Sequence, residues 1–91
     1  MAALESPCSV ASVLRVQRAK QAVVEAACTH RAAHAAWVAS EKALDSINVR
    51  THRRRWNRAY DASCDAQDKL DAAEKALFRA VDRLARTKAG R

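Results

Sequence analysis

The chain contains almost none of the residues that interrupt helices. Its 91 residues include one Gly and one Pro, and neither occurs between positions 8 and 89. Domains built from many short strands need frequent tight turns, which Gly and Pro commonly provide. The composition therefore argues against a turn-rich β-sandwich or barrel and favours an all-α fold.

Bulky apolar side chains are also scarce. Hydrophobic residues make up 49% of the chain, but 22 of them are Ala, and only 20 residues are Val, Ile, Leu, Met, Phe, Trp or Tyr. Ala has the highest helix propensity of all residues and little side chain to bury. The sequence thus predicts long helices with little material for a core.

Long hydrophobic runs and paired cysteines are missing as well. No segment approaches the ~20 consecutive apolar residues of a membrane-spanning helix, so we expect no membrane association. The first eight residues have neither the basic start nor the apolar run of a secretory signal peptide. Three unevenly spaced cysteines, Cys8, Cys28 and Cys64, predict reduced thiols and a cytoplasmic location.

Positive charge is concentrated in the sequence. The net charge is +7, and residues 50–58 alone contribute +5, with five Arg and no acidic residue. Residues 59–78 carry five Asp or Glu against two Lys, whereas residues 79–91 carry five Lys or Arg against one Asp. The chain therefore has a basic middle, an acidic stretch after it and a basic C-terminal segment.

Two seven-residue repeats, out of phase with each other, organise the chain. The larger seam residues are Val16, Val23, His30, Trp37 and Leu44 in the first half, and Trp56, Ser63, Leu70, Leu77 and Leu84 in the second. In both halves a small residue usually follows three positions later. Extending the first repeat gives positions 51 and 58, whereas the second begins at 56. The two repeats are thus out of phase, and the change of phase falls in residues 47–51. This segment contains three β-branched residues and an Asn, all weak helix formers.

These repeats predict an antiparallel helical hairpin with an Ala-rich seam. We expect helices at about 8–47 and 52–87, a turn at about 48–51 and flexible ends at 1–7 and 89–91. Asn48 is expected to end the first helix in the left-handed conformation, and Thr51 to cap the second. The alternative is one unbroken helix that pairs with another chain, and the phase slip argues against it.

A hairpin with so few large seam residues is marginally stable by itself. A second apolar stripe lies outside the seam, and its larger members, together with Cys28, form the candidate interface: Val10, Val24, Cys28, Val38, Phe78 and Val81. We expect two hairpins to dimerise into a four-helix bundle through this stripe, or a partner protein to cover it.

The basic turn is the candidate binding site for a charged partner. A hairpin gathers seven residues near its closed end: Arg50, Arg53, Arg54, Arg55, Trp56, Arg58 and Tyr60. Arginines at a helix start oppose the helix macrodipole, which suggests that they serve binding and not stability. Phosphate is one suitable anion, and the aromatic residues could stack on a base. An acidic protein surface suits five Arg equally, and simple solvation is a third interpretation.

Catalytic and metal-binding patterns are weak. His30 and His34 share a helix face, and Cys64 lies nearby across the hairpin, which gives a low-ranking candidate zinc site. The sequence has no paired Cys motif, phosphate loop or nucleophile elbow, and a two-helix hairpin lacks an ordinary ligand pocket. We therefore expect neither an enzyme nor a cofactor.

The remaining function classes all act by binding. The leading prediction is a small inhibitor or adaptor that docks on a macromolecular partner, most simply a protein; phage and mobile-element accessory proteins that antagonise nucleic-acid-handling or defence complexes are often of this kind. The first alternative is non-specific binding of nucleic acid or a phosphorylated ligand through the Arg-rich turn. The second alternative is a metal-responsive helical bundle.

Overall fold

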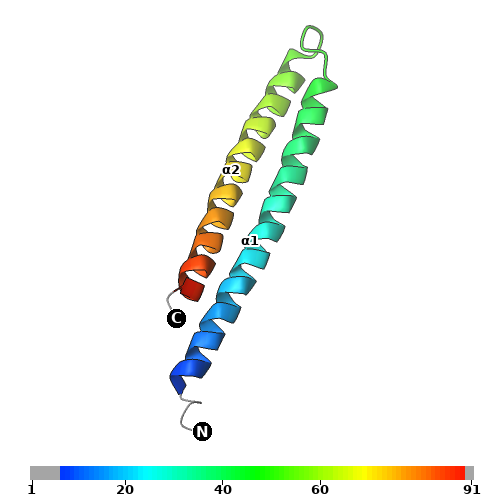
Figure 1. Ribbon diagram of the computed structural model, residues 1–91. Coiled ribbons are helices and arrows are strands. Elements are labelled where there is room, and N and C mark those ends of the chain that lie inside the picture. Colours follow the sequence, from blue (N-terminus) through cyan, green and yellow to red (C-terminus); the bar gives the residue numbers. More distant parts are fainter. Residues whose placement is uncertain (1–6, 90–91) are drawn as a thin grey trace.

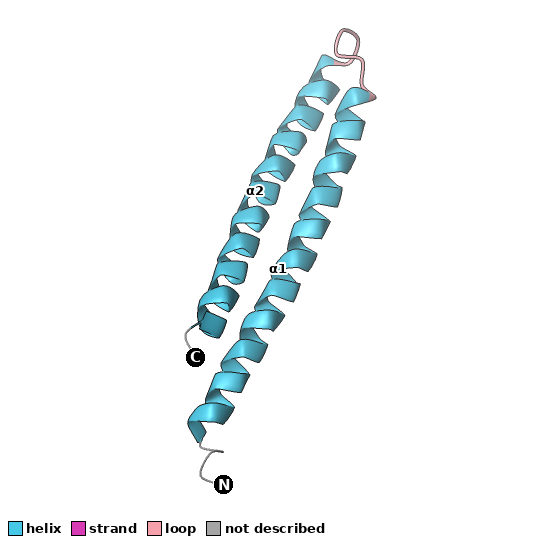
Figure 2. Cartoon of the chain, viewed as in Figure 1, coloured by secondary structure: helices cyan, strands magenta, loops and turns pink. Residues whose placement is uncertain are grey.

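The computed structural model of the chain describes residues 7–89 and shows two long helices packed side by side. Helix α1 spans Pro7–Asp45 and helix α2 spans Arg53–Ala89, and no strand occurs within the described part. The helices run antiparallel and are joined by one short loop (Figures 1 and 2). The prediction of an all-α helical hairpin is confirmed. Of the ends expected to be flexible, only Pro7 and Ala89 are described, and each is the terminal residue of a helix.

The loop is longer than expected and is built differently. It spans residues 46–52, because α1 ends two residues early and α2 starts one residue late. Asn48 is not left-handed: no residue between 7 and 89 has a positive φ. Its side-chain Oδ1 instead accepts a hydrogen bond from the Arg50 backbone N–H at 2.9 Å, which forms an Asx turn.

The start of α2 also differs from the expectation. His52 and not Thr51 precedes the helix, and its carbonyl accepts the first helical bond, from the Trp56 N–H at 2.9 Å. The Thr51 hydroxyl donates a hydrogen bond to the Asn48 carbonyl oxygen at 3.5 Å. Local side-chain bonds to the loop backbone thus replaced the two caps that the sequence suggested.

The seam between the helices is thinly buried. Four described residues are buried, namely Ala19, Ser63, Leu70 and Ala73, at 1–8% exposure. The larger seam residues Val23, Trp37 and Leu77 are only half-buried. Small residues allow the two helices to approach closely, but two helices cannot enclose a bulky side chain completely. The hairpin therefore has a line of contact in place of a core.

A polar contact fixes the alignment of the helices near the closed end. The buried Ser63 hydroxyl donates a hydrogen bond of 2.6 Å to Oε1 of Glu41, which is half-buried on α1. Further along, Ala33 and Lys69 line one shallow groove between the helices. Because the helices are antiparallel, the open end lies before Ala33 on α1 and after Lys69 on α2. Nine residues in that direction lead to Val24 and Phe78, which therefore lie at the same height along the rod.

The molecule is a rod with one uneven end. Its backbone measures 78 × 15 × 13 Å. Twenty residues after Lys69 is Ala89, the end of α2, and twenty residues before Ala33 is Val13, so these two residues lie at the same height. The turns of α1 before Val13 therefore extend past α2, as Figure 1 shows. These turns have no neighbouring helix within one hairpin.

The Ser63–Glu41 bond predicts a specific loss of stability. Ser63→Ala leaves a half-buried carboxylate without its donor and should lower the free energy of unfolding by about 1–2 kcal/mol. Urea unfolding followed by circular dichroism measures the change.

Ser40→Ala is the matched control. The Ser40 hydroxyl donates within its own helix, to the Trp37 carbonyl at 2.7 Å, so its removal should cost less than that of Ser63. Equal effects of the two substitutions would show that the cross-helix bond adds no stability.

Candidate functional site

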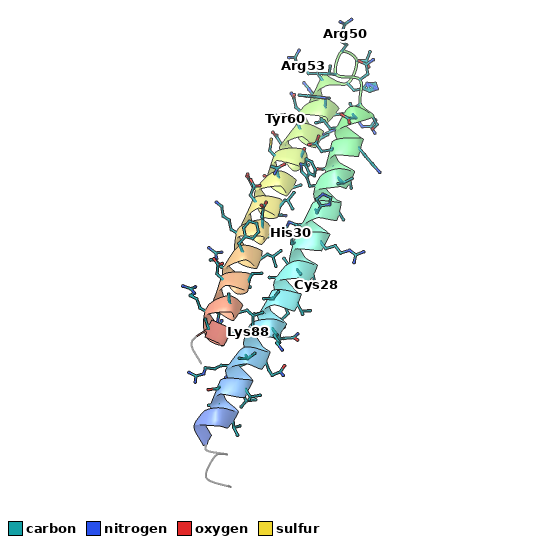
Figure 3. The ribbon with its side chains drawn as sticks, viewed as in Figure 1. Cys28, His30, Arg50, Arg53, Tyr60 and Lys88 are labelled. Carbon is teal, nitrogen blue, oxygen red and sulfur yellow. The ribbon has the colours of Figure 1, made fainter. Side chains whose placement is uncertain are left out.

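The closed end of the rod carries a dense group of arginines, here called the Arg-rich end: Arg50, Arg53, Arg54, Arg55 and Arg58. All five are exposed, and no acidic residue occurs between positions 46 and 60. Arg50 projects from the loop beyond the helices, and Arg53 lies beside it at the start of α2 (Figure 3). The four helical members follow one another within six residues, so their side chains surround the end of α2 and do not form one flat patch.

The backbone strengthens the positive potential at this end. The first turn of α2 contains Arg53, Arg54 and Arg55 and no acidic residue. Helix N-termini carry partial positive charge, so each Arg there is disfavoured by ~0.3–1 kcal/mol. The backbone N–H groups in the first turn of a helix have no partner within the helix. Together with the guanidinium groups of the arginines, they favour an anionic partner.

An aromatic pair lies directly below the arginines. The Trp56 and Tyr60 rings stack with centroids 5.2 Å apart and an interplanar angle of 14°. Trp56 is half-buried in the seam, whereas Tyr60 is 48% exposed. The structure therefore places an accessible flat ring within one to two turns of four Arg side chains, as stacking on a nucleic-acid base requires.

Tyr60 also has an altered ionisation. A hydrogen bond to the Cys64 side chain, and then the negative charge of the Cys64 thiolate, raise the pKa of Tyr60 above its ordinary value of 10.0. Slight desolvation and the Asp61 carboxylate act in the same direction. These interactions all favour the neutral phenol over the phenolate.

A second surface lies on one side of the rod, and we call it the apolar face: Val10, Val13, Val24, Phe78 and Val81. These side chains are 45–58% exposed. With the first repeat extended back by seven residues to position 9, each of these residues follows a position of the larger seam residues by one or four residues. Because antiparallel helices turn in opposite senses when viewed along one direction, such positions on α1 and α2 lie on the same side of the hairpin.

The structure separates the members of the predicted interface. Val10, Val24, Cys28, Phe78 and Val81 are exposed, and Cys28 lies further round α1 than the apolar face; Val38 is half-buried. Sequence reasoning missed Val13 and Leu14, which are 57% and 49% exposed. The spacing of these two residues from Val10, three and four positions, could have revealed them.

The opposite side of the hairpin is lined by small residues. A shallow open groove runs there along both helices and is lined by Thr29, Ala32, Ala33, Lys69, Ala72, Ala73 and Ala76. It continues toward the closed end past Ala36 and Ala62. This side presents little apolar bulk, so the two broad sides of the rod differ in chemistry.

The metal-site residues do not converge. Within residues 7–89, no three His, Cys, Asp or Glu side chains are placed to hold a metal ion. The His34 ring lies 6.0 Å from the Trp37 ring at an angle of 51°. Cys64, the third candidate ligand, is an exposed free cysteine four residues after Tyr60 on α2.

Comparisons with known proteins give no assignment. No protein family model, curated protein or solved structure matches this chain. Neither described helix is long and apolar enough to cross a membrane. The Arg-rich end and the apolar face are therefore the two surfaces that point to a function.

The ionisation of Tyr60 can be tested because it is the only tyrosine in the chain. Cys64→Ala removes both the hydrogen bond and the thiolate charge, so the pKa of Tyr60 should fall toward 10.0. Ultraviolet absorbance titration of the phenolate measures it. Cys28→Ala, on the other helix, should leave the titration unchanged; an unaltered pKa in Cys64→Ala would rule out the contact.

Proposed function

We propose that this chain is a non-catalytic binding protein that docks on another protein through its apolar face, as an inhibitor or adaptor. The observation that carries the proposal is the exposure of five large apolar side chains on one side of a rod in which four of the described residues are buried. Such a surface is typical of protein interfaces, because isolated soluble domains seldom leave large apolar patches in water.

The energy available at this face is substantial compared with the stability of a small domain. Complete burial of a Val or Phe side chain contributes ~1.5–3 kcal/mol. Covering five half-exposed side chains would therefore contribute roughly 5 kcal/mol for each hairpin. Small domains are stable by only ~5–15 kcal/mol in total, so the partner contributes to folding as well as to recognition.

Self-association is part of the proposal. Two hairpins joined by their apolar faces would form a four-helix bundle, in which each helix has two neighbours in place of one. The Arg-rich end lies at the closed end of the rod, more than fifteen residues along α2 from Phe78 and Val81. It remains free to contact an acidic target.

Charged substitutions on the apolar face should abolish association. Val24→Asp combined with Phe78→Asp places two carboxylates at one level of the interface, where burying them is costly. Sedimentation equilibrium should show wild-type mass near twice 10.0 kDa and the double variant as a monomer.

Ala39→Asp is the matched control for this experiment. Ala39 is exposed and follows its seam position by two residues, so it does not lie on the apolar face. It should leave the association intact. A double variant that associates as strongly as wild type would exclude the apolar face as the contact surface.

Nucleic acid is the second candidate partner, favoured by the stacked Trp56–Tyr60 pair beneath the Arg-rich end. Phosphates would contact the arginines, and an unpaired base would stack on the exposed Tyr60 ring. The contacts would be largely independent of sequence, because phosphates carry no sequence information.

This second candidate predicts a steep dependence on salt. With about five phosphate contacts, affinity for single-stranded DNA or RNA should fall about 10²-fold between 50 and 200 mM salt. Replacing Arg53, Arg54 and Arg55 with Ala should remove most of the affinity, as measured by fluorescence anisotropy.

The control for the triple variant has the same loss of charge at the other end of the rod. Arg79, Arg83 and Arg86 replaced with Ala should bind nearly as wild type does. If both triple variants lose affinity equally, net charge and not the Arg-rich end is responsible.

A further inference from the structure

We infer that a second copy of this chain covers the apolar face and lies parallel to the first, so that Arg31 of each copy meets Asp71 of the other. The two Arg-rich ends then lie together at one extremity. This inference rests on the proposed function and adds the identity and orientation of the partner. Three features carry it: the heights of residues along the rod, a shallow pocket on α2 and the area of the face.

Symmetry fixes the register of a parallel pair. A two-fold axis that runs along the rod turns every residue about the axis and leaves its height unchanged. It places α1 of each hairpin against α2 of the other, so every helix has antiparallel neighbours, as in an up-and-down four-helix bundle. The residues that face each other therefore follow from the heights within one hairpin, with no adjustable offset.

These heights match the apolar face with itself. Val24 and Phe78 lie at the same height and are 55% and 58% exposed. Val24 of each copy therefore faces Phe78 of the other. Val81 lies less than one turn further along α2 and falls beside the same Val24. The large apolar residues are thus covered twice, once in each copy.

The same heights bring opposite charges together. Arg31 lies two residues before Ala33, and Asp71 lies two residues after Lys69, so Arg31 and Asp71 have equal heights. Each follows a seam position by one residue, which places it on the side of the rod that carries the apolar face. Both side chains are exposed. In the parallel pair, the Arg31 guanidinium of each copy therefore faces the Asp71 carboxylate of the other.

A shallow pocket on α2 fits this arginine. The pocket is lined by Asp71, Glu74, Lys75 and Phe78. Two carboxylates against one Lys make it net negative, and Oδ1 of Asp71 accepts a hydrogen bond from Gln67 Nε2 at 3.0 Å, which orients the carboxylate. Helical side chains lean toward the N-terminus of their helix, so Arg31 of the second copy leans toward Glu74 and Phe78. A guanidinium there contacts two carboxylates and lies near an aromatic ring.

An antiparallel pair covers the apolar face less well, because all five members of this face lie in the open-end half of the rod. An axis among the α2 members brings Val10 and Val13 opposite Arg31 and His34. An axis nearer the middle of the rod places the apolar residues against the polar closed-end half. A parallel pair sets the apolar half against itself and leaves neither half of the rod without a neighbour.

The overlap is long enough for a stable dimer. Both helices are present from Val13 to Asp45, which is about 48 Å at 1.5 Å per residue. With a rod 15 Å wide, each copy would cover about 700 Å², or about 1,400 Å² in total, within the ~1,200–2,000 Å² of stable interfaces. The face is therefore large enough for a second copy to cover it without another partner.

The parallel pair combines the two Arg-rich ends. Five arginines from each copy meet at one extremity. Salt screens their repulsion beyond about 8 Å at physiological ionic strength, and Asp45 lies about one turn from the height of Arg53 of the second copy. An anionic partner can then contact both Arg-rich ends at once, so the dimer binds it more tightly than one hairpin does.

Two complementary charge variants test the contact between copies. Arg31→Asp makes both facing positions acidic, and Asp71→Arg makes both basic, so each variant alone opposes like charges twice. Each should weaken dimerisation about tenfold or more in sedimentation equilibrium. An equimolar mixture should recover the dimer, because both contacts of a mixed pair join opposite charges. A mixture that stays as monomeric as the separate variants would overturn the inference.

Arg18→Asp is the matched control. Arg18 is exposed and follows its seam position by two residues, so it lies on the side of the Ala-lined groove. It has the same change of charge as Arg31→Asp and should dimerise as wild type does. Equal weakening by the two substitutions would make net charge responsible and refute the contact. Recovery in the mixture remains the readout even where a single variant is less helical.

The distance between the two loops tests the orientation directly. A nitroxide label is attached at Thr51→Cys, in a chain whose Cys8, Cys28 and Cys64 are replaced by Ala. Pulsed dipolar spectroscopy should give about 20–30 Å, two to three helix diameters, for the parallel pair. An antiparallel pair would hold the labels about one rod length apart, near 78 Å, and that result would overturn the inference.

The outcomes separate this inference from the proposed function. A wild-type chain that stays monomeric would refute the second copy, whereas the apolar face can still be tested on a different protein. A dimer that is lost in the Val24→Asp, Phe78→Asp variant but shows the long loop distance would support the proposed face and refute the parallel orientation.

Discussion

Two helices packed side by side can shield only one stripe of each helix from water. In this chain that stripe alternates larger residues with Ala and Ser, and among the described residues only Ala19, Ser63, Leu70 and Ala73 are buried. Large apolar side chains outside the seam, such as Val24 and Phe78, stay exposed in a single hairpin. An exposed apolar face is the direct consequence of a two-helix architecture, and association is the physical means of covering it.

The same architecture separates the two kinds of surface. Folding the chain in half places residues 50–58 at one extremity, where the loop and the start of α2 hold five Arg in a segment without acidic residues. The large apolar residues Val24 and Phe78 lie much nearer the open end. Association through one region therefore leaves the other accessible. A single small chain can thus combine a protein contact with an anion-binding extremity.

The sequence predicted the hairpin because its signals extend over many residues. Two heptad repeats and their phase slip span the whole chain, and helix geometry converts them directly into two arms. The ends of the arms were less predictable. Asn48 bonds to the Arg50 N–H instead of turning left-handed, and His52 takes the place expected for Thr51. These outcomes depend on one or two hydrogen bonds within the loop, which periodicity does not encode. Val13 and Leu14 were missed although their spacing from Val10, three and four positions, marks one side of α1.

Concentration-dependent melting tests most directly whether the apolar face must be covered for the chain to be stable. Thermal unfolding of the wild-type chain, followed by circular dichroism between ~1 and 100 µM, should show a Tm that rises with concentration, since mass action stabilises an associated folded state. A Tm that stays constant over this range, with a single cooperative transition, would show that the isolated hairpin is sufficient. It would contradict the view that this rod is completed by a partner.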